Sequence, residues 1–305
     1  MKLGRIYSGG VQYFLERTFL FWQRLGFHIT PVHYYQPLPD TRELKDGLWQ
    51  KPSELIGVEM NAAGQLTLLA ELSAKYKKEY ESFPRTKTEN PLEYYVNNRT
   101  FTAVDGEILY CLIRSLKPRR ILEIGSGNST FLSAQAILKN KAEDCDYQGE
   151  LVVIDPFPRN EIFKKGFPGL TQLITKKVQA VPLAEFKKLT ANDILFIDSS
   201  HVLKIGSDVQ FLFSEILPRL NPGVVIHFHD IFLPLEYPRK WILQDCLFWT
   251  EQYLLQAFLT FNDTFKVLWG SSYMHLKYPD KLAAAFSSYQ QTAVPPGSFW
   301  LKKIK

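Results

Sequence analysis

The chain has 305 residues, of which 46% are hydrophobic and 22% are charged. This composition excludes an intrinsically disordered protein, and a chain of this length buries a core without disulfide or metal staples. The 36 basic and 31 acidic residues give a net charge of +5. Because the lysines and arginines are scattered in pairs rather than gathered in a stripe, we expect a folded protein with no nucleic-acid partner.

The aromatic-rich segment 11–25 is interrupted by Glu16, Arg17 and Arg24, so it does not form the apolar stretch of a signal peptide. Nowhere do eighteen apolar residues follow one another, which argues against a transmembrane segment. The aromatic residues at positions 13–22 fit two roles, an interface of a homo-oligomer or an intramolecular helix.

The cysteines are odd in number and widely spaced, and none forms a CxxC motif: Cys111, Cys145 and Cys246. We interpret them as reduced thiols in the core of a cytoplasmic protein.

The character of the chain changes near residues 82–91 (SFPRTKTENP), where Pro, Thr and Asn replace periodic apolar residues. We therefore place a domain boundary there. Residues 1–87 are expected to form a helical and extended N-terminal appendage, and residues 88–305 the main domain.

Short β-branched runs alternate with helical patterns after this boundary, which predicts βαβ units and a mostly parallel sheet. The fold class is thus α/β, a Rossmann-like sheet of seven strands that ends in a hairpin. We expect strands at 120–124, 151–154, 173–178, 193–197, 224–228, 265–269 and 298–303, and helices at 104–116, 130–138, 205–220 and 240–261.

The first of these strands ends in a glycine turn that leads into a helix (EIGSGNST, residues 123–130). In such a unit the backbone N–H groups at the start of the helix approach a ligand. Gly125 and Gly127 permit a tight turn and place no Cβ in the way of a cofactor. The turn therefore predicts a cofactor site.

Asp155 ends the second strand (VVIDP), at the spacing of the ribose-binding carboxylate in dinucleotide folds. A nicotinamide cofactor would call for a third glycine near Thr130, and it does not explain an acid at Glu123 inside the first strand. A buried glutamate needs a partner, which favours nearby backbone amides or the amino and sulfonium groups of S-adenosylmethionine.

These motifs, with DILFIDSSH and IHFHDIF further along, resemble the class I S-adenosylmethionine-dependent methyltransferases. Within that superfamily the sequence resembles the small-molecule O-methyltransferases grouped with cephalosporin-hydroxylase-like and macrolide-tailoring enzymes. The resemblance covers about residue 88 to the C-terminus. It implies that the cofactor is bordered by Glu123, Gly125, Ser126, Gly127, Ser129, Asp155, Gln179 and Asp198. Asp155 would hold the ribose and Gln179 the adenine, while Ser129 stands where many relatives have a third glycine.

Polar clusters follow the fourth and fifth strands, DSSH at 198–201 and HFHD at 227–230. Ligands of open α/β sheets bind at that edge. In similar metal-dependent O-methyltransferases acids at these strand ends hold Mg²⁺, so the resemblance implies a divalent site at Asp198, His229 and Asp230. His201 is the expected general base, with Asp198 and Asp230 as catalytic partners, because an imidazole titrates near neutral pH. Capping roles for the two acids and a backbone bond for His201 stay open.

We therefore expect an S-adenosylmethionine-dependent methyltransferase that methylates an oxygen of a small hydroxylated metabolite, a sugar or a secondary-metabolite intermediate, with Mg²⁺ as a possible aid. Two alternatives remain, a nicotinamide-dependent oxidoreductase and a catalytically silent binding protein with the same fold.

Overall fold

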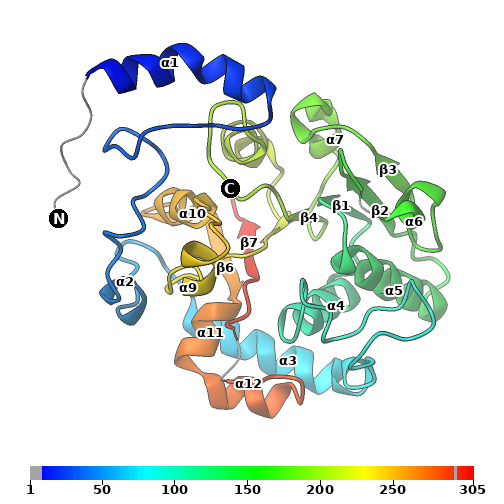
Figure 1. Cartoon of the computed structure of the whole chain (residues 1–305). Helices are drawn as coiled ribbons and strands as arrows, with labels where there is room; N and C mark the ends of the chain where they lie inside the picture. Colours follow the sequence, from blue (N-terminus) through cyan, green and yellow to red (C-terminus); the bar gives the residue numbers. More distant parts are fainter. Residues whose placement is uncertain (1–8, 159, 292–293) are drawn as a thin grey trace. The chain divides into compact units, whose positions relative to one another are not determined.

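The computed structural model describes residues 9–158, 160–291 and 294–305 (Figure 1). The chain forms two compact units. The smaller unit comprises residues up to 50 together with 239–248, and the larger one comprises 51–238 and 249–305.

The smaller unit contains three helices, α1 (Gly9–Arg24), α2 (Gly47–Gln50) and α9 (Arg239–Leu243). Its two chain segments are joined at Arg239, whose guanidinium lies 2.8 Å from the carboxylate of Asp46 and 5.6 Å from the ring centre of Trp49. This pairing explains why a short segment from late in the chain belongs to the N-terminal unit.

The larger unit is built on one seven-stranded sheet with the order β3-β2-β1-β4-β5-β7-β6. Strands β1 to β5 are parallel, and β7 lies antiparallel between β5 and β6. The predicted Rossmann-like sheet of seven strands is therefore confirmed. The last two strands pair antiparallel, but residues 271–298 with two helices lie between them, so the predicted hairpin is wrong. The strands are β1 (Arg120–Ile124), β2 (Glu150–Ile154), β3 (Gln172–Ile174), β4 (Ile194–Ile197), β5 (Val225–Phe228), β6 (Phe265–Gly270) and β7 (Phe299–Lys303).

Alternate residues of each strand enter two hydrophobic cores, one on each face of the sheet. Ile121 and Phe196 pack in the core that helices α3, α4 and α5 cover, whereas Leu122 and Ile197 pack in the core that receives Leu255 of α10. The helices of this unit are α3 (Ala62–Tyr80), α4 (Asp105–Leu116), α5 (Asn128–Glu143), α6 (Glu161–Lys165), α7 (Leu183–Lys187), α8 (Asp208–Phe211), α10 (Glu251–Leu259), α11 (Ser271–Lys277) and α12 (Pro279–Ala285).

Three short helical turns complete the larger unit. Val178–Ala180 forms a 3-10 turn, and α8 continues through a π-helical segment, Leu212–Ile216, into a 3-10 turn, Leu217–Arg219. The third strand is consequently shorter than predicted, and Gln179 lies in a helical turn after it.

The predicted continuous helix 240–261 is wrong. The segment contains α9 and α10 with irregular chain between them. The backbone N–H groups of Thr250 and Glu251 donate to the carbonyl of His201 at 2.9 and 3.1 Å. This tertiary contact fixes where α10 begins, and the apolar periodicity of the segment does not report it.

The cysteines differ from the prediction of three core thiols. Cys111 is buried in α4, whereas Cys145 and Cys246 are exposed because both lie in irregular segments between elements.

The predicted domain boundary after residue 87 stays a prediction, and the compact units are divided elsewhere, at residue 50. The reason is that α3 packs on α4 within the larger unit (Figure 1). Glu79 of α3 accepts hydrogen bonds from Tyr110 at 2.7 Å and from Arg114 at 2.9 Å. Over the described residues, no helix has the length and apolarity that crossing a membrane requires.

Candidate functional site

The glycine turn after β1 contacts the end of β4. Gly125 has φ +88°, and a Cβ added there would lie 2.4 Å from the carbonyl oxygen of Asp198. Only glycine fits this position, because an L side chain would meet both strain and backbone. Gly127 differs, since its backbone is extended and no atom lies within 4 Å of an added Cβ. The turn therefore leaves open space at the start of α5.

Glu123 is almost fully buried beneath this turn. Its Oε1 accepts hydrogen bonds from Ser129 at 2.6 Å and from Thr130 at 2.9 Å, while its Oε2 has no partner among the described residues. Burial raises the pKa of Glu123 to about 8, although the two hydroxyl donors lower it. The sequence placed Ser129 at the cofactor, and the structure shows that its hydroxyl holds Glu123.

Asp155 follows β2 on the other side of the turn. Its Oδ2 accepts a hydrogen bond from Ser126 at 2.5 Å, and its Oδ1 accepts one from the backbone N–H of Phe157 at 2.8 Å. The carboxylate is only partly buried and each oxygen keeps a free lone pair. Asp155 is thus oriented by the glycine turn and still able to accept from a ligand.

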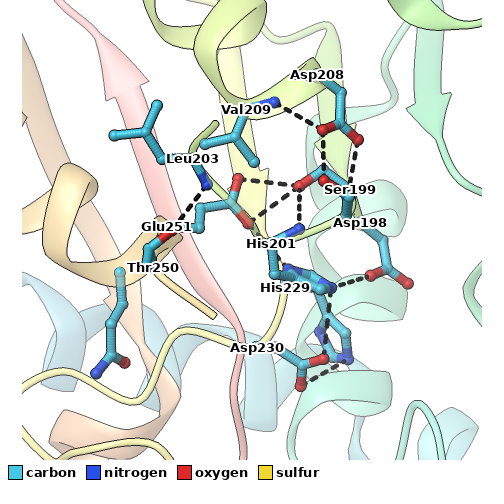
Figure 2. Close-up of polar contacts among 12 residues, drawn as sticks. Asp198, Ser199, His201, Leu203, Asp208, Val209, His229, Asp230, Thr250 and Glu251 are labelled. Atoms are coloured by element: carbon cyan, nitrogen blue, oxygen red, sulfur yellow. Dashed lines mark hydrogen bonds and ion pairs between the residues drawn. The ribbon is translucent and has the colours of Figure 1, made fainter. Parts of the chain in front are cut away.

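His201 stands at the centre of a cluster of carboxylates (Figure 2). Its Nδ1 lies 2.9 Å from Oε2 of Glu251, and its Nε2 lies 3.2 Å from Oδ1 of Asp198 and 3.7 Å from Oδ2 of Asp230. Its ring also packs 4.4 Å from Trp249. Glu251 is fully buried at the start of α10, so it reaches the histidine but not the solvent.

Local hydrogen bonds hold His201 in a left-handed backbone conformation, with φ +59°. Its N–H donates to Ser199 Oγ at 3.1 Å, and Ser199 in turn donates to both oxygens of Glu251. Asp208 accepts from the N–H of Ser200 at 2.8 Å and so anchors the preceding residue. The DSSH turn is therefore fixed from two helices, α8 and α10.

Three carboxyl groups surround one imidazole, so the negative charges of the cluster outnumber its single positive charge when all four groups are ionised. Burial lowers the pKa of His201, but its hydrogen bonds to Asp198 and Glu251 raise that pKa well above its ordinary value. Burial also raises the pKa values of Glu251 and Asp230. Burial opposes ionisation of Asp198 too, yet the hydrogen bond from His201 holds its pKa below the usual range. The site therefore favours bound positive charge, a proton or a metal ion.

His229 lies at the edge of this cluster, beside Asp230. Its Nε2 lies 3.1 Å from the carbonyl oxygen of Thr100 and 3.7 Å from Oδ1 of Asp230, and its Nδ1 has no partner among the described residues. His227 lies on the same face of the sheet as His229, and the centres of their stacked rings are 5.6 Å apart. The His227 ring contacts Phe196 and bonds Ser298, so it is a core residue.

Within the described part of the chain, the side chains that could hold a cation are those of Asp198, His201 and Asp230, whose ligand atoms all lie within 4.8 Å of one another. The predicted set contained His229 in place of His201. The structure brings the two acids together as the strand ends suggest, but the Nε2 that faces them belongs to His201. The metal assignment itself stays a prediction.

Gln179 lies outside this cluster. Its Nε2 donates to the carbonyl oxygen of Gly206 at 2.9 Å, which ties the turn after β3 to the segment before α8. The adenine-binding role of Gln179 stays a prediction. Sequence reasoning did not single out Glu251, because the segment FWTEQY carries no motif and its contact with His201 spans 50 residues.

In comparisons with known proteins, the segment that contains this site matches a protein family. Residues 122–231, which run from β1 to the loop after β5, match the family described as "Methyltransferase domain". An uncharacterized protein of Archaeoglobus fulgidus is 29% identical over 180 residues, which cover 56% of this chain and 78% of that protein. The nicotinamide-dependent oxidoreductase alternative has no support in these matches.

Among solved structures, an O-methyltransferase from Bacillus cereus in complex with S-adenosylhomocysteine is 14% identical, covering 95% of this chain and 100% of that one, with a TM-score of 0.37. CmcI without ligand is 13% identical, covering 73% and 90%, with a TM-score of 0.38. The plantazolicin methyltransferase BpumL is 14% identical, covering 78% and 98%, with a TM-score of 0.33.

The residues of the glycine turn fit S-adenosylmethionine. Among the described residues the buried Oε2 of Glu123 lacks a partner, Gly127 borders open space, and the oxygens of Asp155 can accept further hydrogen bonds. This fit and the sheet order agree with the family match, which identifies an S-adenosylmethionine-dependent methyltransferase domain over residues 122–231.

Proposed function

We propose that the protein transfers the methyl group of S-adenosylmethionine to an oxygen of a small hydroxylated metabolite, a sugar or a secondary-metabolite intermediate. The observation that carries the proposal is the direct contact between the cofactor turn and the DSSH turn, where Gly125 packs on the backbone of Asp198. Methyl transfer requires little covalent machinery beyond alignment of the two reactants and removal of a proton. The turn proposed to bind the cofactor and the turn proposed to remove the proton lie at the same edge of the sheet.

The cofactor supplies an activated methyl group on a sulfonium centre. Glu123, Ser126 and Asp155 would hold it by the amino acid and ribose parts, as their positions around the glycine turn suggest. The acceptor hydroxyl would then lie over the ends of β4 and β5, beside Asp198 and Asp230.

Removal of the hydroxyl proton falls to the His201 cluster. Since the carboxylates hold a proton on His201, the imidazole alone is a poor base near neutral pH. A divalent cation on Asp198, His201 and Asp230 would replace that proton and balance the carboxylates. It would also lower the pKa of the acceptor hydroxyl, whose proton would then leave to solvent water. The charge imbalance therefore favours the metal-assisted route over unassisted base catalysis by His201.

Calorimetric titration with S-adenosylhomocysteine tests the proposal, with Asp155→Ala as the pocket variant and NAD as the control ligand. We expect micromolar binding that the variant abolishes, followed by transfer of radioactive methyl from S-adenosylmethionine to a hydroxylated acceptor. Tighter binding of NAD would overturn the proposal. Cofactor binding without transfer to any acceptor would instead support a catalytically silent protein.

A further inference from the structure

A cavity of about 280 Å³ lies between residues 97–103 on one wall and residues 288–290, Val294 and Pro296 on the other. It is lined mainly by polar side chains, among them Asn97, Arg99, Thr102, Ser288, Tyr289 and Gln290. Arg99 is the one charged residue among the described residues of this lining. The volume falls just below the range of drug-sized pockets, about 300–1,000 Å³, and suits a single sugar ring or a fragment of similar size.

The wall that carries Arg99 is held rigidly by a buried asparagine. Asn98 Oδ1 accepts from the N–H groups of Thr100 and Phe101 at 3.1 and 2.8 Å, and its Nδ2 donates to the carbonyls of Tyr95 and Phe101. Arg99 itself takes φ +74°, a strained conformation for a residue with a side chain. Strain of this kind persists where the surrounding structure imposes it, commonly at ligand sites.

Thr100, in the same wall, forms hydrogen bonds with a residue after β5 and with a residue of the glycine turn region. The carbonyl of Thr100 accepts from His229 at 3.1 Å, and its hydroxyl accepts from Asn128, the first residue of α5, at 2.8 Å. The cavity wall therefore joins the end of β5 to the glycine turn.

On the opposite wall, the residues that follow Pro296 contact the segment that contains Asp230. The N–H groups of Gly297 and Ser298 donate to the buried carboxylate of Asp105 at 2.9 and 3.0 Å, and the carbonyl of Gly297 accepts from Ile231 at 2.8 Å. A Cβ on Gly297 would lie 3.1 Å from Cα of Asp230. Pro296, which lines the cavity, thus directly precedes a residue that contacts the end of β5.

The guanidinium of Arg99 is available to a ligand. Arg99 is exposed and forms no ion pair with the described residues. Of the nearby acids, Asp105 is committed to the two backbone N–H groups, and Glu107 accepts from Ser288 and from the N–H of Val104. A planar guanidinium recognises carboxylate and phosphate groups with two parallel hydrogen bonds.

We propose that this cavity is the acceptor subsite and that it takes a hydroxylated molecule bearing an oxyanion, a carboxylate or a phosphate, which Arg99 binds while the reacting hydroxyl reaches Asp230. The inference rests on the proposed function and names the class of its substrate. The hydroxyl and amide groups of Thr102, Ser288 and Gln290 would bond the remaining hydroxyls of the ligand.

The test is calorimetric titration of the protein loaded with S-adenosylhomocysteine, using three probes of equal ring size: D-glucose, D-glucuronate and D-glucose 6-phosphate. The variants are Arg99→Gln and Arg99→Lys, with Lys141→Gln as a matched loss of an exposed cation on α5. Transfer of radioactive methyl to each probe is measured in parallel.

We expect at least one acidic probe to bind about 10- to 100-fold more tightly than glucose, the range for a hydrogen bond to a charged group. Arg99→Gln should remove that preference, Arg99→Lys should retain part of it, and Lys141→Gln should leave it unchanged. Comparison of the affinities for glucuronate and glucose 6-phosphate shows whether the subsite prefers a carboxylate or a phosphate.

Equal binding of glucose and both acids, binding of neither acid, or an unchanged preference in Arg99→Gln would each overturn the inference while S-adenosylhomocysteine still binds. Failure of S-adenosylhomocysteine to bind at all would instead remove the proposed function.

Discussion

Nδ1 of His201 lies 2.9 Å from Oε2 of the fully buried Glu251. This bond fixes the histidine ring so that Nε2 points to Asp198 and Asp230, because the donor role of Nδ1 is committed to the glutamate. Glu251 touches none of the positions expected for cofactor or acceptor, so it acts through His201 as a positioning residue.

Glu251→Gln keeps the shape of the side chain and removes its charge. We expect kcat, for any acceptor that is turned over, to fall about 10- to 100-fold, the usual cost of losing such a supporting bond. Steady-state kinetics and calorimetry check this, with Glu215→Gln at an exposed ion pair as the control. Binding of S-adenosylhomocysteine should not change. A variant that loses thermal stability but keeps kcat would contradict the positioning role.

Alanine substitution of the two glycines of the cofactor turn should change stability to very different extents. Gly125→Ala meets the carbonyl oxygen of Asp198 at positive φ, so we expect the free energy of unfolding to drop by about 2 kcal/mol or more. Gly127→Ala enters open space on extended backbone and should change stability by less than about 0.5 kcal/mol.

The same Gly127→Ala variant should nevertheless weaken S-adenosylhomocysteine binding about 10-fold, since the methyl group fills space that we assign to the cofactor. Urea unfolding and calorimetry measure the two effects separately. Unchanged affinity in this stable variant would show that the open space at Gly127 is not used by the cofactor.

Glu123 predicts how stability depends on pH. Its pKa is raised from 4.5 to about 8, so between these values the folded protein holds a proton that the unfolded chain has lost. The corresponding stability is complete below pH 4.5 and is lost as the pH rises toward 8, by up to about 1.4 kcal/mol per pH unit.

Glu123→Gln lacks this titration. The difference in unfolding free energy between wild type and variant, measured by urea denaturation from about pH 5 to about pH 8, should therefore become less favourable to the wild type as pH rises. A difference that stays constant over this range would mean that Glu123 is already ionised in the folded protein.

Measurements of cation binding distinguish His201 from His229 as the metal ligand. We expect Mn²⁺, used as a probe for Mg²⁺, to bind with an affinity that Asp230→Asn and His201→Gln each reduce about 10-fold or more. His229→Gln should change it little, because Nε2 of His229 already bonds Thr100. Calorimetry measures all three variants. Loss of Mn²⁺ binding in His229→Gln alone would restore the set predicted from sequence.

The sheet was predictable because its strands are buried on both faces and their apolar runs are short and sharply bounded. The first strand matches residue for residue, and Asp198 and Asp230 meet because β4 and β5 are neighbours with aligned ends. Local sequence and the rules of parallel sheets suffice for these features.

The supporting residues were not predictable in the same way. From the sequence, Glu251 is an ordinary acid inside the predicted helix 240–261, and Asn98 is a loop residue. Their contacts depend on chain segments brought together only by folding. The left-handed turn at His201, which points a second imidazole toward the acids, also has no local signal in the sequence. The assignment of His229 as a ligand stays a prediction. The cytoplasmic location and a homo-oligomer stay predictions.

The edge strand β6 is closed by side chains rather than by another strand. Asn61 donates its amide to the carbonyl of Val267 at 2.9 Å, and Gln65 accepts from the N–H of Gly270 at 2.8 Å. An open edge is a template for pairing with a second chain, and amides that occupy its hydrogen-bonding groups deny that template. The start of α3 therefore protects the sheet from edge-to-edge aggregation, and a shortened protein that begins at residue 88 would expose a row of unsatisfied backbone groups.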